Sequence, residues 1–257
     1  MDTILLEIAN LSKHFGGVIA LSEVDMQVHQ GRISSLIGPN GAGKTTLFNC
    51  VTGLDGPTMG EVRFLGQNLA GKRPDQITRL GLARTFQNIR LFSELTVLDN
   101  VKIGRHCRSR SHLWASVSRN RKQRREEAAI TERSTDMLQF VGLEQHGEQL
   151  AGNLSYGDQR RLEIARALTT DPTLLLLDEP AAGMNPIETQ QLMELIYAIR
   201  EKGVTILLIE HDMKVVMQIS EWVTVLDHGE KISDGEPEAV QNDEKVIKAY
   251  LGTSYDA

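Results

Sequence analysis

The sequence has little of what marks secreted, membrane-spanning or disulfide-rich proteins. Its 257 residues include only two cysteines, Cys50 and Cys107, too few for a disulfide scaffold and without metal-ligand spacing, as expected in a reducing compartment. The longest apolar runs, 174–177 and 206–209, fall far short of the ~20 residues that a membrane-spanning helix needs. The first residues lack the basic and apolar segments of a secretory signal, so we expect no such signal.

The chain also has no excess of positive charge. The 28 Lys and Arg residues against 34 Asp and Glu give a net charge of −6, which does not favour nucleic acid, and we expect no nucleic-acid partner. The exception is the stretch 105–125, which holds eight basic residues and no acidic one. Such a stretch would suit a membrane surface or an acidic partner, but a solvated helix and loop is the simpler interpretation.

The distribution of apolar residues predicts an α/β fold. Short strand-like segments near the N-terminus indicate a small antiparallel sheet; they cover 5–8, 24–28 and 61–65. Continuous apolar runs are typical of parallel strands buried on both faces; they cover 33–37, 174–177 and 204–209. Helical spacing is predicted for 188–201, and from about 75 to 169 the pattern favours helices without strands.

We therefore expect one domain over residues 1–257. Its core and antiparallel β subdomain would take about 1–87 and 170–257, with an inserted helical subdomain over about 88–169. The core would be a parallel sheet of the kind found in P-loop NTPases, because a phosphate-binding motif follows the strand predicted at 33–37.

That motif is the most informative segment of the chain. It fits G-x-x-x-x-G-K-[ST] and lies between a predicted strand and a predicted helix, which is the context it needs. Its glycines let the backbone close around phosphates, and the following helix points its positive end at them. Lys44 would bind the β- and γ-phosphates, and the hydroxyl of Thr45 would bind Mg²⁺. The predicted nucleotide-binding residues are Gly38, Pro39, Asn40, Gly41, Ala42, Gly43, Lys44, Thr45 and Thr46.

A pair of acidic residues ends the apolar run 174–177. Asp178 and Glu179 follow it directly, which is the Walker B pattern expected downstream of a P-loop. Mg²⁺ prefers a few carboxylates together with phosphate oxygens, so Asp178 is a predicted metal ligand, directly or through water. Glu179 would face the γ-phosphate and accept a proton from the attacking water, a role worth ~10²–10⁴-fold in rate.

The next apolar strand also ends in polar residues, in the order Glu210, His211 and Asp212. Strand ends near a P-loop converge on one crevice of the sheet. We therefore expect His211 to lie near the γ-phosphate and to orient either the water or the base.

A second anion site is predicted far along the chain. Ser155 is a good N-cap for the helical run that follows it, and Gly157 permits a close backbone approach. Free N–H groups at the start of a helix bind anions. A second phosphate-binding helix is explained if each chain contacts the nucleotide that its partner holds.

Together these motifs resemble those of the ATP-binding subunits of ABC transporters, over nearly the whole chain. They occur in the order of that family: the P-loop, Phe86-Gln87, Leu-Ser-x-Gly at 154–157, Leu-Leu-Asp-Glu-Pro at 176–180, and a late histidine. The resemblance implies an ATPase that uses ATP and Mg²⁺. It also implies three residue roles: Gln87 contacts Mg²⁺ and water, Ser155 and Gly157 close over the ATP of the opposite subunit, and Phe15 stacks on adenine.

The chain departs from the family pattern in two motifs. Tyr156 and Asp158 replace the Gly and Gln of the usual Leu-Ser-Gly-Gly-Gln signature, and Asn185 replaces the Asp of the usual Ser-Ala-Leu-Asp that follows Walker B. An acid at position 158 would weaken phosphate binding, and Asn185 would alter communication between the two sites. We expect both departures to affect the rate of ATP hydrolysis more than the fold. Without the family, Phe15 would fit a core position equally well.

Finer details resemble branched-chain amino acid importers, specifically the larger of their two ATPase subunits. The segments that carry this resemblance are 84–87, 90–92, 154–157, 180–186, 209–213 and 249–252. It implies three partners: a second ATPase subunit (a paralogue, or another copy of this chain), transmembrane permeases and, indirectly, an extracytoplasmic substrate-binding protein. The chain would be peripheral, at the cytoplasmic face of the inner (plasma) membrane.

Other functions remain open at this level. Importers of urea or short amides and lipopolysaccharide exporters have similar ATPase subunits. A soluble ABC ATPase acting on nucleic acid or ribosomes is less favoured, because the chain has one cassette, no coiled-coil arm and a negative net charge. A nucleotide sensor without hydrolysis is disfavoured because Lys44, Asp178, Glu179 and His211 occur together.

Overall fold

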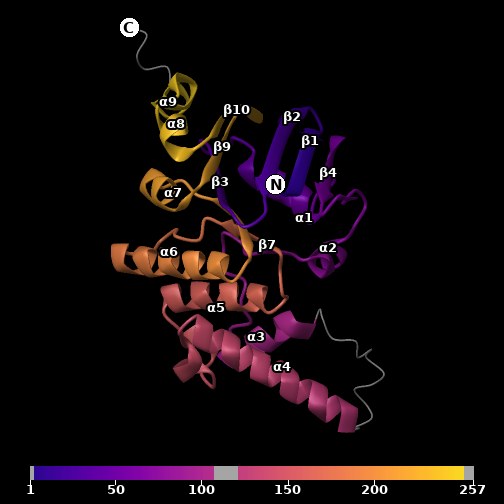
Figure 1. Ribbon diagram of the computed structural model, residues 1–257, viewed down its shortest axis with the longest axis vertical. Helices are drawn as coiled ribbons and strands as arrows, with labels where there is room; N and C mark the ends of the chain where they lie inside the picture. The colour runs from indigo at the N-terminus through magenta and orange to yellow at the C-terminus, as the bar shows by residue number, and fades with distance from the viewer. Residues whose placement is uncertain (1–2, 107–120, 252–257) are drawn as a thin grey trace.

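The computed structural model describes residues 3–106 and 121–251 of the chain. Two sheets lie toward one end of an elongated molecule, and a stack of helices that includes α5 and α4 forms the other end (Figure 1). Most of the basic stretch 105–125 lies outside the described residues, but Arg105 at its start forms an ion pair with Asp171. Among the described residues, no helix is long and apolar enough to cross a membrane.

The smaller sheet is antiparallel, as predicted for the N-terminal part of the chain. Its spatial order is β2 (Val18–His29), β1 (Ile4–Phe15), β4 (Met59–Phe64) and β5 (Gln67–Asn68). The strands β1 and β2 extend well beyond the predicted segments, and the additional residues mix apolar and polar side chains without a strict alternation. The turn that joins them contains Gly16, whose φ of 58° suits glycine.

The larger sheet carries the predicted buried strands. Its spatial order is β10 (Glu230–Gly235), β9 (Trp222–Asp227), β3 (Ile33–Ile37), β8 (Thr205–Ile209), β7 (Leu174–Asp178) and β6 (Leu82–Arg84). All neighbours pair in parallel except β9 and β10. Every residue of β3, β7 and β8 is buried, which explains the continuous apolar runs of β7 and β8; β3 also buries Ser34 and Ser35.

The expectation that 75–169 lacks strands is wrong at β6. This strand is only three residues long, too short for a recognisable apolar period, and it exists because it pairs with β7, some ninety positions further on. Its pairing places the segment that follows, including Gln87, beside the end of β7.

Helices cover the larger sheet and form the insertion. Within the described residues they are α1 (Lys44–Thr52), α2 (Pro74–Leu80), α3 (Val97–His106), α4 (Arg121–Phe140), α5 (Tyr156–Leu168), α6 (Pro186–Glu201), α7 (Met213–Ile219), α8 (Pro237–Gln241) and α9 (Glu244–Leu251), with short 3₁₀ turns at Glu144–His146 and Ala151–Asn153. The predicted helix 188–201 corresponds to α6, which begins two residues earlier because Asn185 caps it and Pro186 suits the first helical turn.

The two faces of the larger sheet pack into separate apolar clusters. Leu47 and Phe48 of α1 belong to the cluster between the two sheets, whereas Leu162 of α5 and Ile196 of α6 belong to the cluster on the other face. This arrangement fixes β3, β7 and β8 side by side, so that their carboxyl ends lie at one edge of the sheet.

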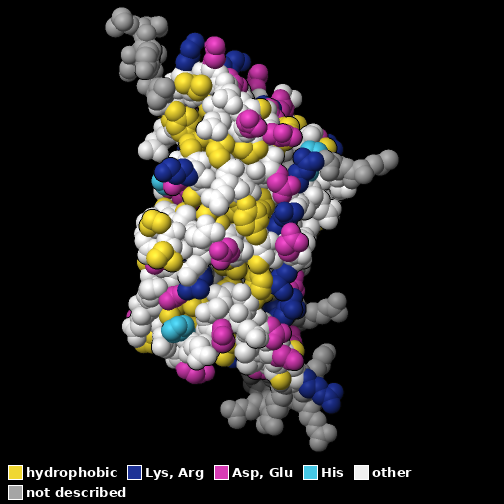
Figure 2. All heavy atoms as spheres, turned by 60° about the vertical axis from the view of Figure 1, so that its left-hand side comes forward, with side chains coloured by type: hydrophobic (Ala, Val, Ile, Leu, Met, Phe, Trp, Pro, Cys, Tyr) yellow, Lys and Arg dark blue, Asp and Glu magenta, His cyan; other side chains and the backbone are white. Residues whose placement is uncertain are grey.

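One face of the molecule carries charges of both signs (Figure 2). Figure 2 shows acidic and basic side chains interspersed among small apolar groups on this face. Such a mixture is unlike the single-sign surface expected of a nucleic-acid-binding face.

Candidate active site

The P-loop has the backbone of a phosphate cradle. Gly38, Gly41 and Gly43 have φ values of 150°, 83° and 100°. A Cβ at Gly38 would lie 2.0 Å from the carbonyl oxygen of Leu226, and one at Gly43 would lie 2.7 Å from that of Ala20. The helix α1 begins directly after the loop, and no side chain caps its N-terminus. These features fit a phosphate group bound by backbone N–H groups.

Lys44 is folded against its own loop. Its ammonium donates to the carbonyl oxygens of Gly38 at 2.7 Å and Pro39 at 2.9 Å, and the residue is only 7% exposed. Burial lowers the pKa of Lys44, and the nearby carboxylates of Glu179 and Asp178 partly oppose that effect. The fold therefore places the P-loop lysine next to both Walker B acids.

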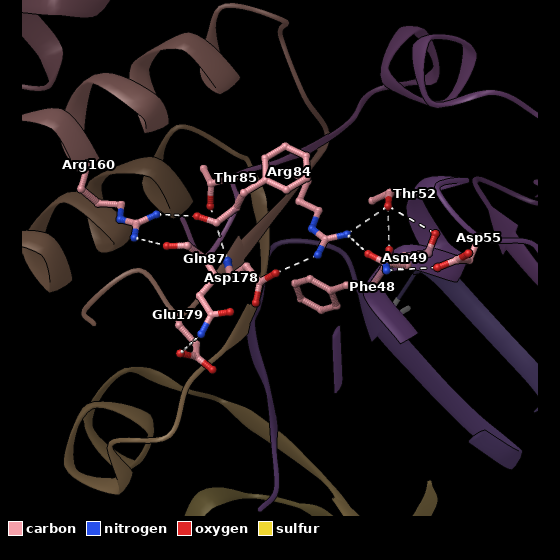
Figure 3. Close-up of polar contacts among 11 residues, drawn as sticks. Phe48, Asn49, Thr52, Asp55, Arg84, Thr85, Gln87, Arg160, Asp178 and Glu179 are labelled. Carbon is pink, nitrogen blue, oxygen red and sulfur yellow. Dashed lines mark hydrogen bonds and ion pairs between the residues drawn. The ribbon is translucent and has the colours of Figure 1, made fainter. Parts of the chain in front are cut away.

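The three predicted catalytic residues also come together. The amide nitrogen Nε2 of Gln87 donates to Oε2 of Glu179 at 3.0 Å (Figure 3), and Nδ1 of His211 lies 3.7 Å from the same oxygen. Glu179 has a φ of 46°, an uncommon conformation for a residue with a side chain. Strain of this kind concentrates at functional sites, because the surrounding structure must hold it in place.

Glu210 was not among the predicted site residues, yet it supports one of them, His211. Its buried carboxylate accepts hydrogen bonds from the backbone N–H of Ala181 at 2.9 Å and of His211 at 3.2 Å. Burial raises the pKa of Glu210, and these two hydrogen bonds partly oppose that effect. Its position at the end of an apolar strand was the only sequence signal.

Asp178 is held by a second residue that the sequence analysis did not select. Nη2 of Arg84 lies 2.7 Å from Oδ2 of Asp178, and both side chains are almost completely buried. Nη1 of the same guanidinium donates to Oδ1 of Asn49 on α1 at 2.8 Å (Figure 3). Its central carbon Cζ lies 5.4 Å from the ring centroid of Phe48 and 5.1 Å from that of Phe86. Arg84 thus joins the P-loop helix, the Walker B strand and the segment that carries Gln87.

We expect the variant Arg84→Met to lose stability. Methionine retains an apolar chain between the two rings but leaves the buried Asp178 carboxylate unpaired, and breaking one side of such a pair typically destabilises by about 3–5 kcal/mol. Urea denaturation measures the free energy of unfolding. Adding Asp178→Asn removes the unpaired charge, so the double variant should recover part of the loss. A double variant no more stable than Arg84→Met would exclude the ion pair as the cause.

At the carboxyl ends of the parallel strands, the side chains could supply a few ligands to a metal ion, and a bound nucleotide would supply most of the others. Among the described residues, no group of three His, Cys, Asp or Glu side chains is placed to hold a metal. The candidates are the Asp178 carboxylate, the exposed Thr45 and the exposed Gln87, all from segments that border the P-loop. Mg²⁺ commonly binds in this way, through one or two protein oxygens together with phosphates and water.

Ser155 and Gly157 lie elsewhere, at the start of α5. In Figure 1, α5 is in the helical half of the molecule, away from α1 and the P-loop. The hydroxyl of Ser155 accepts from the N–H of Asp158 at 3.2 Å and donates to the carboxylate of Asp158 at 2.8 Å. The predicted second anion site is therefore not part of the P-loop site of the same chain.

Comparison with known proteins decides which family this geometry represents. The family profile described as "ABC transporter" matches residues 21–182. The chain belongs to the ABC transporter family. A second profile, described as "Branched-chain amino acid ATP-binding cassette transporter", matches residues 230–256.

The relatives of this ABC transporter chain are similar over nearly its full length. The high-affinity branched-chain amino acid transport ATP-binding protein LivG of Escherichia coli (strain K12) is 46% identical over 253 residues, which cover 98% of this chain and 99% of LivG. Its counterpart BraF of Pseudomonas aeruginosa is 45% identical over the same shares.

Solved structures of ABC cassettes share the fold. A nucleotide-free ATP-binding cassette from an ABC transporter superposes with a TM-score of 0.85 at 32% identity, over 97% of this chain and 100% of the other. A dimeric cassette in a post-hydrolysis state, bound to ADP and Pi, has a TM-score of 0.76 at 26% identity, over 91% of this chain and 99% of the other.

In this ABC transporter chain, the residues that depart from the usual family motifs each have a partner in the structure. The charge of Asp158 is paired with Arg161 on the next helical turn, so the acid does not stand alone beside the signature. The ring of Tyr156 packs near Gly183, where an added Cβ would lie 3.5 Å from it. Asn185 replaces the usual acid as the N-cap of α6, where its side chain accepts from two backbone N–H groups.

Phe15 of this ABC transporter chain is not a core aromatic. It is 47% exposed at the end of β1, beside the turn to β2, and the ammonium of Lys13 lies 4.7 Å from its ring centroid. An exposed ring in this position is available for stacking, as the family resemblance implies.

Proposed function

We propose that this chain is the ATPase subunit of an importer for the branched-chain amino acids leucine, isoleucine and valine. The observation that carries the proposal is the similarity to LivG and BraF over almost the whole of all three chains, including the branched-chain profile at 230–256. The chain itself need not touch the amino acid, because substrate choice would lie in permeases and a binding protein outside the membrane.

The site supports ATP hydrolysis by residues in distinct roles. Lys44 and the P-loop N–H groups would hold the phosphates, Thr45 and Asp178 would hold Mg²⁺, and Arg84 would keep Asp178 in place. Bound Mg²⁺ would neutralise charge on the phosphates. Glu179 would accept the proton of the attacking water.

Two residues contact this base directly and would orient it. Gln87 hydrogen-bonds to Glu179, and His211 lies within 3.7 Å of it, so both are placed to fix the carboxylate and the water beside it. Phe15, exposed at the end of β1, would stack on the adenine ring.

A second cassette would complete the site. Ser155 and Gly157 lie apart from the P-loop of their own chain (Figure 1), and the N-terminus of α5 is suited to an anion, so we infer that they close over ATP held by a partner. Each of two ATP molecules would then lie between the P-loop of one subunit and the signature of the other. The partner would be a paralogous ATPase subunit or another copy of this chain.

A surface hollow whose lining includes Arg84, three positions before Gln87, supports a permease contact. The hollow, of about 340 Å³, opens between α3, α5 and the end of β6, and it is lined by Arg84, Phe92, Ile103, Glu163 and Arg166 among others. The ring of Phe92 is 52% exposed, although it lies beside buried elements. We propose that a cytoplasmic loop of the permease binds in this hollow, which would hold the chain at the cytoplasmic face of the inner membrane.

Uptake of labelled leucine tests the proposed function. Host cells lacking this gene would be complemented with the wild type or with Glu179→Gln, and uptake should return only with the wild type. Normal uptake without the gene, or no return with the wild type, would contradict branched-chain transport. The same cells would then be tested with urea, since urea importers have similar ATPase subunits.

A further inference from the structure

Two buried charged residues on α5 have no role in the ATP site described above. Arg160 and Glu163 are one helical turn apart, with exposed side-chain fractions of 0% and 1%, and their charges pair at 2.9 Å. Removing two charges from water is costly, and a well-packed apolar pair is often as stable. The stability of α5 alone therefore does not account for a buried charged pair at these two positions.

Both residues bind the backbone of the segment that carries Gln87. Nη1 of Arg160 donates to the carbonyl oxygen of Phe86 at 2.6 Å, and Nη2 donates to that of Gln87 at 2.8 Å (Figure 3). Oε1 of Glu163 accepts from the N–H of Arg90 at 3.2 Å. The pair thus holds the segment 86–90 near both of its ends.

The same segment reaches the proposed base. Between the two ends that α5 holds, the side chain of Gln87 donates to Glu179 at 3.0 Å. On the other side, Ser155 caps α5 only five residues before Arg160, which is about 7.5 Å along a helix axis. A single rigid turn and a half of helix therefore joins the partner-facing signature to the backbone of Gln87.

We propose that Arg160 and Glu163 are positioning residues that hold the backbone of segment 86–90 so that Gln87 stays in contact with Glu179. This role rests on the proposed function. A planar guanidinium holds two adjacent carbonyl groups in a fixed geometry through its rigid set of N–H donors, whereas a lysine ammonium is a compact donor on a flexible chain.

Steady-state hydrolysis by the purified full-length chain tests this role. The variant Arg160→Met/Glu163→Met removes both charges together, so neither is left buried and unpaired. We expect kcat to fall about tenfold or more while KM for ATP stays within about threefold, because the P-loop is untouched. Arg160→Lys should give an intermediate kcat. Arg133→Met, which removes a half-exposed ion pair with Asp171, is the control and should leave both constants unchanged.

A double-mutant cycle with Gln87→Ala separates positioning from a merely structural role. If the pair acts through Gln87, adding Gln87→Ala to the double variant should lower kcat by less than about twofold more, although it lowers the wild-type kcat strongly. Fully multiplicative losses, or a wild-type kcat in the double variant, would overturn the proposal. Absence of ATP hydrolysis by the wild type, both alone and together with its paralogous ATPase subunit, would instead count against the proposed function itself.

Hydrogen exchange provides a readout that is independent of catalysis. The amide of Arg90, which Glu163 accepts from, should exchange faster in the double variant, whereas amides of α1 should keep their wild-type rates. Faster exchange throughout α1 would mean that the pair only maintains the fold and would also overturn the proposal.

Discussion

The variant Glu179→Gln should bind ATP but hydrolyse it ~10²–10⁴-fold more slowly, the usual range for loss of a general base. Glutamine has the shape of glutamate, and its side-chain oxygen can still accept from Gln87, which donates to Oε2 at 3.0 Å in the wild type. The amide cannot take a proton from water at neutral pH. Single-turnover hydrolysis and the Kd for ATP, measured on the same preparation, separate chemistry from binding.

The same variant should accumulate with ATP trapped between two subunits, since hydrolysis would no longer reopen them. Size-exclusion chromatography with and without ATP detects this as an ATP-dependent increase in size. Glu201→Gln, an exposed acid at the end of α6, is the matched control and should behave as the wild type. If Glu179→Gln hydrolysed ATP at the wild-type rate, the base would have to be another residue, and His211 would be examined next.

The parts of the fold that were predictable are those with local signals. The strands β7 and β8 are buried on both faces, so their sequences contain continuous apolar runs that can be recognised without knowledge of the neighbouring strands. The P-loop is equally local, because its glycines are dictated by positive φ values and by backbone atoms that leave no space for a Cβ. Both could therefore be identified from the residues alone.

The parts that escaped prediction depend on contacts between distant segments. Arg84 pairs with Asp178, ninety-four positions away, and Arg160 binds carbonyl oxygens seventy-three and seventy-four positions away. A charged residue in a sequence is expected to be exposed unless its partner is known, and nothing local identifies such a partner. The strand β6 was missed for the same reason, since only its pairing with β7 makes it a strand.

The position of Phe15 could be predicted only in part. The sequence alone allowed either a core position or an exposed one, and only the family resemblance favoured adenine. The structure removes the core alternative, because the hairpin of β1 and β2 extends past the sheet and leaves the ring 47% exposed. Its contact with adenine stays a prediction.

Lys44→Ala should weaken ATP binding by about 100-fold or more. Charge-assisted hydrogen bonds are worth about 1.5–3 kcal/mol each, and two of them to phosphate oxygens would account for a factor of this size. The loss should exceed that of an exposed lysine because Lys44 is 7% exposed and is surrounded by the low-dielectric interior of the loop. Titration calorimetry with ATP and Mg²⁺ measures the Kd directly.

Lys44→Ala should also destabilise the loop, and this loss of stability must be separated from the loss of ATP binding. The ammonium also donates to the carbonyl oxygens of Gly38 and Pro39, so its removal takes two buried hydrogen bonds from the loop. Thermal unfolding without nucleotide measures that contribution alone, and Lys248→Ala, an exposed lysine of α9, is the control. A small change in Tm together with a large rise in Kd would assign the effect to the phosphates, whereas an unchanged Kd would contradict the role of the P-loop.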